Sequence, residues 1–338
     1  MSFFSINNGN YRNMKYNFCT LFDSHYLIRG LAMYQSLAKH LADFHLYIYP
    51  FDDECLKVLR KLDLPNVTLV PIQDLKDEEF LKIKDNRNPK EYCWTGKPCI
   101  TRHALINFNL ESITYIDADL YFFYPPEAII DELGNDAILI TEHRFPADED
   151  KSRLTGKYCS QLITFKNNAG GWQVLDWWRK SCLQWCYDKY EDGKFGDQKY
   201  LDDWTTRFTG VHELQHLGGG VAIWNVNNYN ITKENNNLWV REKNSAKVLP
   251  LIFYHFHGVR LFNLSSRVIV ESTQFINKDI KKLIYLKYSE ELTRAWLLIK
   301  TVRPEFKLGF SKNLIYFRKL LGKFLPAKLK KLLKTSIA

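Results

Sequence analysis

The first half of the chain alternates apolar, strand-type segments with segments of helical periodicity. Strands are expected at residues 16–22, 45–49 and 67–71, with helices between them at 27–41 and 53–62. After a polar loop, a helix from about residue 98 to 108 leads into another strand, which ends near Asp117. Strands that alternate with helices form a mostly parallel sheet covered by helices on both faces. The sequence therefore predicts an α/β fold, in which ligands bind at the carboxyl ends of the strands.

The second half continues with fewer elements. Strands are expected at residues 137–141 and 158–166, and a helix at 172–190. Within that helix, large apolar side chains recur every three to four residues and predict a buried face: Trp172, Leu175, Trp178, Cys182 and Trp185. Cys182 and Cys186 lie in the same helical segment, so we interpret them as packing residues rather than as metal ligands.

Composition limits the architecture and the compartment. With 338 residues, of which 46% are hydrophobic, the chain can bury the core of one large domain with an appendage. Its seven cysteines include no Cys-x-x-Cys pair, and its first residues form no apolar leader. Both features favour a reducing cytosol over secretion. No run of 18 or more apolar residues occurs, so we predict no bilayer-spanning helix.

The net charge of +9 is located at the end of the sequence. No acidic residue follows Glu305, whereas nine basic residues do, so residues 1–305 are neutral as a whole. A neutral body argues against nucleic acid as a partner. In the tail, apolar residues recur at helical spacing opposite lysines: Leu314, Phe317, Leu321, Phe324 and Leu325 against Lys312, Lys319 and Lys323. This pattern predicts an amphipathic helix that either lies on an anionic membrane surface or packs on the body with its basic face in solvent.

Two carboxylates follow the apolar strand that begins at residue 112. In an extended segment alternate side chains share a face, so Asp117 and Asp119 are expected to point the same way. Two such oxygen ligands suit Mg²⁺ or Mn²⁺, which completes its shell with phosphate oxygens and water. The alternative is a strand that ends in acidic turn residues. Asp148 and Asp150 have the same spacing, but no strand precedes them, and we interpret them as part of a solvated loop.

Two further segments carry polar groups at predicted turns. In the turn after the first strand, an aromatic ring and small polar groups could hold a nucleobase and a ribose, or Asp23 or Ser24 could simply cap the next helix. At residues 195–200, a glycine turn places Asp197 and Gln198 at the start of a short helix, where Asp197 could act only as an N-cap.

Histidines occur in two patterns that could bind metal. His255 and His257 alternate to one face of a predicted strand and would suit Mn²⁺ beside two carboxylates, although a histidine on a strand can also be structural. Residues 212–216 match the zinc-peptidase pattern His-Glu-x-x-His through His212, Glu213 and His216. That pattern needs a continuous helix, and glycines at 210 and 218–220 disfavour one, so we treat a zinc metallopeptidase as the rival hypothesis.

In this order, over residues 16–260, the segments resemble the family 8 glycosyltransferases of the GT-A fold, a group that includes glycogenin and bacterial lipooligosaccharide galactosyltransferases. The resemblance implies a Rossmann-like mixed sheet flanked by helices, followed here by a C-terminal helical basic tail. It implies that Mn²⁺ or Mg²⁺ is held by Asp117, Asp119 and His255. It further implies nucleotide contacts from Thr20, Phe22, Tyr26 and Asp117, with Tyr26 stacked on uracil, and places Asp197 and Gln198 beside the anomeric carbon.

The activity implied by this resemblance is retaining transfer of a hexose from a UDP-sugar to a lipid-linked oligosaccharide or other glycan acceptor. The implied context is lipopolysaccharide or capsule synthesis, with the enzyme peripheral on the cytoplasmic face of the cell membrane. The chain departs from the family pattern at residues 158–161, where an Asn-(Ala/Ser)-Gly strand is usual, and Lys97 and Arg102 only approximate the basic residue of the preceding helix. A non-enzymatic membrane-surface protein, acting through its tail, is the second rival hypothesis.

These assignments divide the chain into four parts. Residues 1–15 are predicted to be a flexible arm, residues 16–265 a GT-A catalytic domain, residues 266–310 a helical extension, and residues 311–338 a basic membrane-associating tail.

Overall fold

The computed structural model describes residues 15–243, 245–264 and 266–311. The predicted N-terminal arm, apart from its last residue, and the basic tail, apart from its first, lie outside these residues. Within the described part, no helix has the length and apolar character needed to cross a membrane.

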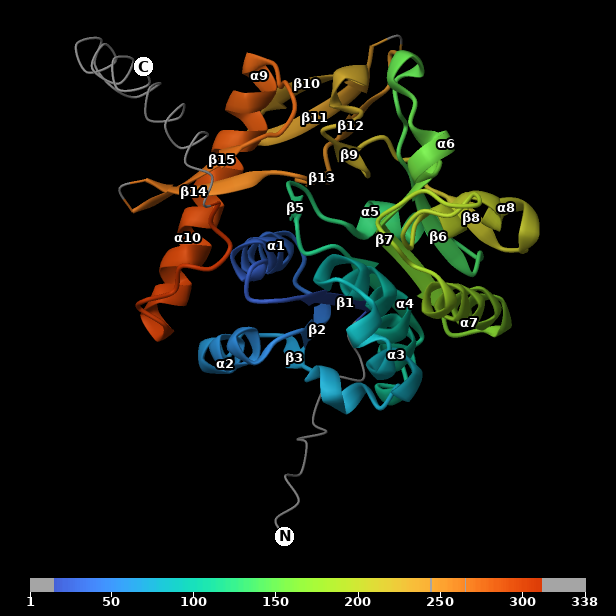
Figure 1. Ribbon diagram of the computed structural model, residues 1–338. Helices are drawn as coiled ribbons and strands as arrows, with labels where there is room; N and C mark the ends of the chain where they lie inside the picture. Colours follow the sequence, from blue (N-terminus) through green and yellow to red (C-terminus); the bar gives the residue numbers. More distant parts are fainter. Residues whose placement is uncertain (1–14, 244, 265, 312–338) are drawn as a thin grey trace, which may run out of the picture.

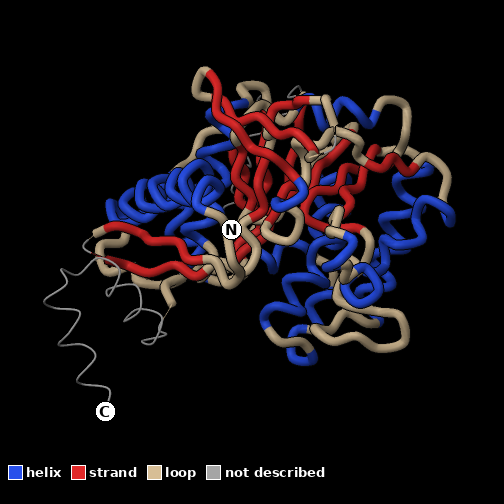
Figure 2. The backbone as a smooth tube through the Cα atoms, turned by 90° about the horizontal axis from the view of Figure 1, so that it is seen from above, coloured by secondary structure: helices blue, strands red, loops and turns tan. Residues whose placement is uncertain are grey.

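A seven-stranded mixed sheet forms the centre of the molecule, in the order β3-β2-β1-β4-β7-β6-β8. Its strands are β1 (Tyr16–Phe22), β2 (Phe44–Pro50), β3 (Val67–Leu69), β4 (Ser112–Ile116), β6 (Ile138–Glu142), β7 (Tyr158–Lys166) and β8 (Val211–Glu213). The first four are parallel, as predicted, and β7 runs antiparallel to both β4 and β6. Figure 2 shows most of the strands in the middle of the molecule, with helices to either side.

Helices cover both faces of this sheet (Figure 1). The longer ones are α1 (Leu27–His40), α2 (Asp53–Leu62), α4 (Pro89–Asn107), α7 (Ala169–Gln184) and α10 (Leu286–Val302). The shorter ones are α3 (Glu78–Lys82), α5 (Glu127–Ile130), α6 (Ser152–Thr155), α8 (Trp204–Arg207) and α9 (Lys278–Ile280). Alternate residues of each strand point to opposite faces, so Phe18 packs in the core on the α1 side and Cys19 in the core on the α4 side.

Two helices begin earlier than the sequence suggested, because their capping residues lie upstream. Helix α4 starts at Pro89 rather than near residue 98: Asn88 and Glu91 form a reciprocal capping box, and Pro98 lies inside the helix. Helix α7 starts at Ala169, where the Asn168 side chain accepts from the Gly171 amide, and ends at Gln184 instead of residue 190. By contrast, β1, α2 and β7 have the predicted bounds.

Smaller sheets extend the fold on the α1 side. One contains β5 (Leu120–Phe122), β13 (Phe253–His255) and β9 (Val221–Ala222), and a second contains β10 (Tyr229–Glu234), β11 (Asn237–Glu242) and β12 (Val248–Pro250). Strand β5 follows directly on the turn after β4, and its antiparallel pairing with β13 sets His255 opposite Leu120. This register brings His255 beside the Asp117–Asp119 turn across more than a hundred residues of chain.

The C-terminal part packs into the same core as the sheet. The hairpin β14 (Arg260–Leu264) and β15 (Arg267–Glu271) precedes α10, and the core cluster on the α1 side runs from Tyr16 to Phe306. The domain limit suggested at residue 265 falls between the two paired strands of this hairpin and stays a prediction.

Candidate active site

Asp117 and Asp119 lie in a tight turn between β4 and β5. The Leu120 amide donates to the Asp117 carbonyl at 3.3 Å, and the Asp117 amide donates to the Gln161 carbonyl at 2.9 Å. Strand alternation therefore does not orient Asp117 and Asp119, contrary to our expectation, because residues 118 and 119 form a turn. Both carboxylates nevertheless face His255: its Nε2 is 3.1 Å from Asp119 Oδ1 and 3.8 Å from Asp117 Oδ2.

His255 is buried and held in one orientation by Gln161. Its Nδ1 lies 2.7 Å from Gln161 Oε1, and since that oxygen can only accept, Nδ1 carries the proton and Nε2 faces the carboxylates. Burial lowers the pKa of His255, but Asp119 raises it more, to about 10. Burial likewise raises the pKa of Asp119, and His255 lowers it further than burial raises it. The pair is thus a proton-bridged acid–base pair whose proton a cation can replace.

The residues fit a divalent cation. Asp119, His255 and His257 each offer a ligand atom, and these atoms lie within 4.8 Å of one another. A histidine whose other ring nitrogen donates to an amide or carbonyl oxygen is the usual arrangement in metal sites, because the second bond fixes the tautomer. His257 follows the end of β13 and is exposed.

Lys97 is the site residue whose position the sequence left open. It is buried on α4, and its Nζ lies 3.0 Å from Asp117 Oδ1, 3.3 Å from Asp197 Oδ2 and 2.9 Å from Ser160 Oγ. The two carboxylates raise its pKa although burial lowers it. Arg102, the other basic candidate, pairs at 2.7 Å with Asp176 and is partly exposed. The signal for Lys97 was the capping box at residue 88, which places Lys97 in mid-helix facing the sheet.

The two residues predicted to lie beside the anomeric carbon have different surroundings. Asp197 is buried against Lys97, and burial raises its pKa although Lys97 lowers it. It does not cap the following 3₁₀ turn, Lys199–Asp203, whose preceding residue is Gln198. The Gln198 side-chain amide donates to the Thr155 carbonyl at 2.7 Å, so the structure orients it toward α6.

The predicted nucleotide residues are divided between the interior and the surface. Thr20 and Phe22 are buried in β1, and the Phe22 ring packs so closely on Gly30 of α1 that a Cβ there would approach it to 2.5 Å. Tyr26 is 44% exposed, and the guanidinium of Arg29 lies 4.7 Å from its ring centroid. Asp23 caps the intervening turn by accepting from the amides of His25 and Tyr26. Of these residues, only Tyr26 presents its ring to solvent.

The zinc-peptidase hypothesis is wrong, because residues 211–213 form strand β8 of the central sheet instead of a helix. His212 is 2.9 Å from Glu132 and 3.4 Å from Asp136. Glu132 also accepts from the amide of His216 at 3.0 Å. Arg144 donates to the carbonyls of Leu214 and Gly219, both at 2.9 Å. Residues 212–219 are therefore a strand end and a loop, which hydrogen bonds to Glu132 and Arg144 hold in place.

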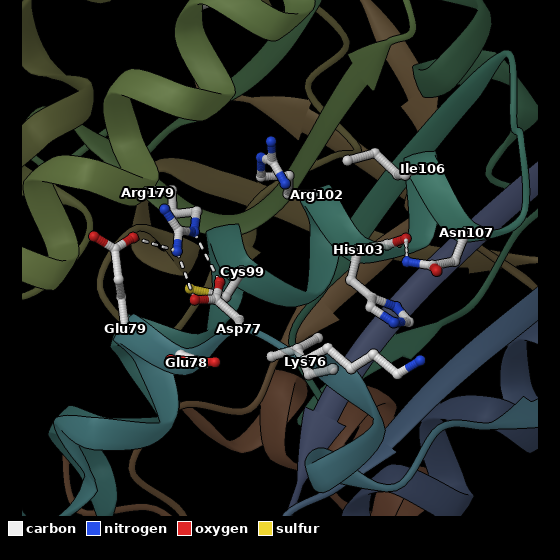
Figure 3. A pocket seen from close by; sticks show the side chains of 11 residues that line it. Lys76, Asp77, Glu78, Glu79, Cys99, Arg102, His103, Ile106, Asn107 and Arg179 are labelled. Atoms are coloured by element: carbon white, nitrogen blue, oxygen red, sulfur yellow. Dashed lines mark hydrogen bonds and ion pairs between the residues drawn. The ribbon is translucent and has the colours of Figure 1, made fainter.

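A separate polar cavity of about 550 Å³ lies on the outer side of α4, between the segment after β3, α3 and α7 (Figure 3). At one end, Arg179 makes two hydrogen bonds to the Asp77 carboxylate, at 2.8 and 2.5 Å, and one of 2.8 Å to Glu79. Asp77 also caps α3 through the Phe80 amide. Arg102 lines this cavity, whereas none of the residues predicted to contact the metal, the nucleotide or the anomeric carbon does.

Replacing Asp77 by Asn should lower the free energy of unfolding by about 1.5–3 kcal/mol, because Asn can cap α3 but lacks the charge and the second acceptor oxygen that Arg179 contacts. Burial raises the pKa of Asp77 but Arg179 lowers it further, so this contribution is present at neutral pH and is lost as the pH falls through the lowered pKa. Urea unfolding at neutral and acidic pH measures both effects. Glu78→Gln, which removes an exposed pair with Lys82, is the control and should leave stability nearly unchanged. Equal effects of the two substitutions would refute the assignment.

Comparison with known proteins places the chain in a family. No protein-family model matches it. Two uncharacterised proteins of Bacillus subtilis (strain 168) are similar over most of their length. YfnD is 30% identical over 304 residues, which cover 87% of this chain and 94% of YfnD. YfnF is 33% identical over 306 residues, which cover 88% of this chain and 97% of YfnF.

The chain belongs to the family of YfnD and YfnF. The fold of this YfnD/YfnF-family protein is also seen in the galactosyltransferase LgtC, whose crystal structure contains donor and acceptor sugar analogues. The two align with a TM-score of 0.52 and 10% identity over 82% of this chain and 95% of LgtC. The expected GT-A fold, a mixed sheet flanked by helices, is thereby confirmed.

Proposed function

We propose that this protein is a metal-dependent glycosyltransferase that moves a hexose-type sugar from a UDP-sugar to a glycan acceptor. The observation that carries this proposal is the meeting of two charged groups at the carboxyl end of β4 in a GT-A fold. Asp119 and His255 form one group, and Lys97, Asp117 and Asp197 form the other. The first group suits a cation that binds a diphosphate, and the second suits a sugar. A nucleotide-sugar donor carries its diphosphate next to its sugar, so one donor could contact both groups.

A cation held at Asp119 and His255 would supply Lewis-acid stabilisation for a departing diphosphate. The chain's own contribution is orientation, because Gln161 fixes the His255 ring and the turn after β4 fixes Asp119. Both residues are buried, so water competes little for these positions.

Tyr26 is our candidate for stacking on the uracil base. Its exposed ring stands at the start of α1, and Arg29 lies against it and donates to the Val259 carbonyl at 3.1 Å. A ring held by a buried arginine offers a flat face with little conformational entropy to lose on binding. Asp117, whose carboxylate accepts from the Tyr115 hydroxyl at 2.7 Å, is our candidate for the ribose side of the nucleotide.

At the proposed position of the reacting carbon, burial raises the pKa of Asp197 and the neighbouring Lys97 opposes that rise. Two retaining routes are open to these residues. In one, Gln198 stabilises positive charge at C1 while the acceptor hydroxyl attacks from the side of the leaving group; in the other, Asp197 attacks C1 itself to form a covalent intermediate. In both routes the C1–oxygen bond to the diphosphate breaks, and the acceptor hydroxyl finally bonds to C1 and loses its proton.

For the acceptor we propose a lipid-linked precursor of a surface polysaccharide, met at the cytoplasmic face of the membrane. The support is the amphipathic basic pattern of residues 312–338, which lie outside the described residues. A protein that acts only by binding membranes through this tail is the competing hypothesis. It predicts that removing the tail abolishes function while changes at Asp117 do not.

Thermal or chemical unfolding with nucleotides tests the proposal first. UDP at about 100 times its dissociation constant should raise the free energy of unfolding by about 2.7 kcal/mol when Mn²⁺ is present, and far less without it. ADP and GDP are the controls, and a panel of UDP-sugars then identifies the donor through UDP release. If no nucleoside diphosphate stabilises the protein with any divalent cation, the proposal is wrong.

A further inference from the structure

The segment that follows α10, residues 303–311, is fixed to the body of the protein at both ends. At its start, Arg303 Nε lies 2.8 Å from a carboxylate oxygen of Glu54 in α2. At its end, the Ser311 amide donates to the carbonyl of Leu261 in β14 at 2.7 Å. Helix α10 itself packs beside α1, as Figure 1 shows. We call residues 303–311 the C-terminal strap.

Aromatic packing holds the middle of the C-terminal strap against α10. The Phe306 side chain is buried, and its carbonyl accepts from Trp296 Nε1 at 3.3 Å. The Phe310 ring stands edge-on to the Trp296 ring, with the centroids 5.5 Å apart. Leu308 packs against the same core. The strap therefore follows a fixed path, although it forms neither a helix nor a strand.

Gly309 brings the C-terminal strap into contact with the turn that precedes Tyr26. Its φ is +84°, and a Cβ at this position would lie 2.5 Å from the His25 carbonyl oxygen. A side chain cannot approach a backbone oxygen so closely, and the left-handed conformation also favours glycine. The His25 carbonyl belongs to the peptide unit that leads into Tyr26. A displacement of this oxygen would therefore move Tyr26 as well.

The buried Arg29 joins the same turn to the segment after β13. Its guanidinium donates to the carbonyls of His25 and Val259, at 3.4 and 3.1 Å. Its centre also lies 4.7 Å from the centroid of the Tyr26 ring. Val259 is two residues before Leu261, whose carbonyl accepts from the strap. Three segments that are far apart in the sequence thus meet beneath the exposed ring of Tyr26.

We infer, on the basis of the proposed nucleotide-binding function, that the C-terminal strap positions Tyr26 for stacking on the nucleobase and that Gly309 sets the contact. The Tyr26 ring is largely open to solvent, so its position depends on the backbone that carries it. The diphosphate side of the site is held differently. The turn after β4 fixes Asp119, and Gln161 fixes the His255 ring. A change in the strap should therefore affect recognition of the base and leave recognition of the diphosphate intact.

Calorimetric titration of the full-length protein with UDP and with inorganic pyrophosphate, both in the presence of Mn²⁺, tests the inference. UDP should bind Gly309→Ala about tenfold more weakly than the wild type, which is comparable to losing a stack between a base and an aromatic ring. Pyrophosphate has no base, so it should bind the variant and the wild type equally. A strap that only stabilises the fold would lower the unfolding temperature without separating the two ligands.

Gly193→Ala is the matched control. Gly193 has a similar φ of +73°, but a Cβ there would meet no atom of the described residues within 4 Å. This substitution imposes comparable backbone strain without the close contact, and it should leave UDP binding unchanged. Phe310→Ala removes the ring that packs on Trp296 and adds no atom near His25. It should weaken UDP binding in the same direction, and it decides the question if Gly309→Ala does not fold.

The outcomes separate the strap from the proposed function. Unchanged UDP affinity in Gly309→Ala and Phe310→Ala would overturn the role of the strap and leave the proposed function intact. Equal weakening of UDP and pyrophosphate in these variants would overturn it too, because the effect would then not concern the base. If the wild type binds no nucleoside diphosphate with any divalent cation, both the function and the role of the strap are wrong.

Discussion

Replacing Lys97 by Met should lower the free energy of unfolding by about 3–5 kcal/mol, the cost of leaving buried charge without its partner. The Lys97 side chain is 6% exposed and faces Asp117 and Asp197, whose side chains are 17% and 3% exposed. Met has a similar volume, so the change removes charge rather than packing. Urea unfolding followed by circular dichroism measures the difference.

The same helix offers a matched control. Lys90 of α4 pairs with Asp188 at 2.8 Å, but the two side chains are 52% and 37% exposed. Lys90→Met should therefore cost no more than about 1 kcal/mol. If the two lysine substitutions cost the same, the buried triad does not carry the stability assigned to it.

The stability lost in Lys97→Met should also depend on pH. Burial raises the pKa of Asp197 and Lys97 lowers it, so without Lys97 the folded-state pKa rises further. A carboxyl with a raised folded-state pKa favours folding while protonated and loses that advantage as the pH rises through this pKa. The deficit relative to the wild type should accordingly shrink as the pH is lowered from about 7 to about 5, which unfolding curves at each pH would show.

Replacing Asp119 by Asn should abolish Mn²⁺-dependent stabilisation by UDP, a loss of about 2.7 kcal/mol at a UDP concentration about 100 times the wild-type dissociation constant. Asn keeps the shape of the side chain but lacks the charge that binds a cation. Since Asp119 is the largest of the groups that raise the pKa of His255 against burial, the variant should also lower that pKa. Differential scanning calorimetry with and without UDP and Mn²⁺ provides the measurement.

Asp148→Asn is the control for this experiment. Asp148 belongs to the second Asp-x-Asp match, which lies in an exposed 3₁₀ turn, and its replacement should leave the response to UDP intact. Sugar transfer from the UDP-sugar donor should fall with Asp119→Asn and persist with Asp148→Asn. A wild-type response to UDP and Mn²⁺ in Asp119→Asn would show that the cation, if one binds, lies elsewhere.

Elements with strong local signals could be predicted from the sequence. Strand β1, helix α2 and strand β7 have the expected bounds. Apolar runs and capping residues act over a few neighbouring residues, so they can be recognised in the sequence. Asp52, which accepts from the Cys55 amide, is one such cap. Helix α4 was predicted too short, from about residue 98, whereas the capping box at residue 88 starts it at Pro89. That error moved Lys97 out of the helix and hid its approach to the sheet.

The candidate site divides in the same way. Asp117, Asp119 and His255 were found from the sequence and meet in the structure. The residues that contact these three side chains were not all found from the sequence. Lys97 of α4 pairs with Asp117, whereas Gln161 of β7 and Trp224 of the loop after β9 contact His255. The His-Glu-x-x-His pattern at residues 212–216 shows the opposite case, in which a matching sequence is folded into a strand and loop.

The sequence by itself determined the α/β class, most strand and helix positions, and the acidic turn after β4, because periodicity, caps and turns act over a few residues. Only the tertiary structure decided that Asp117 pairs with Lys97 while Asp119 pairs with His255, and that His257 shares their space. These relations depend on the register of β5 with β13 and on the face that α4 turns to the sheet. Such contacts join residues far apart in the chain, and burial of the whole core, rather than any local preference, selects them.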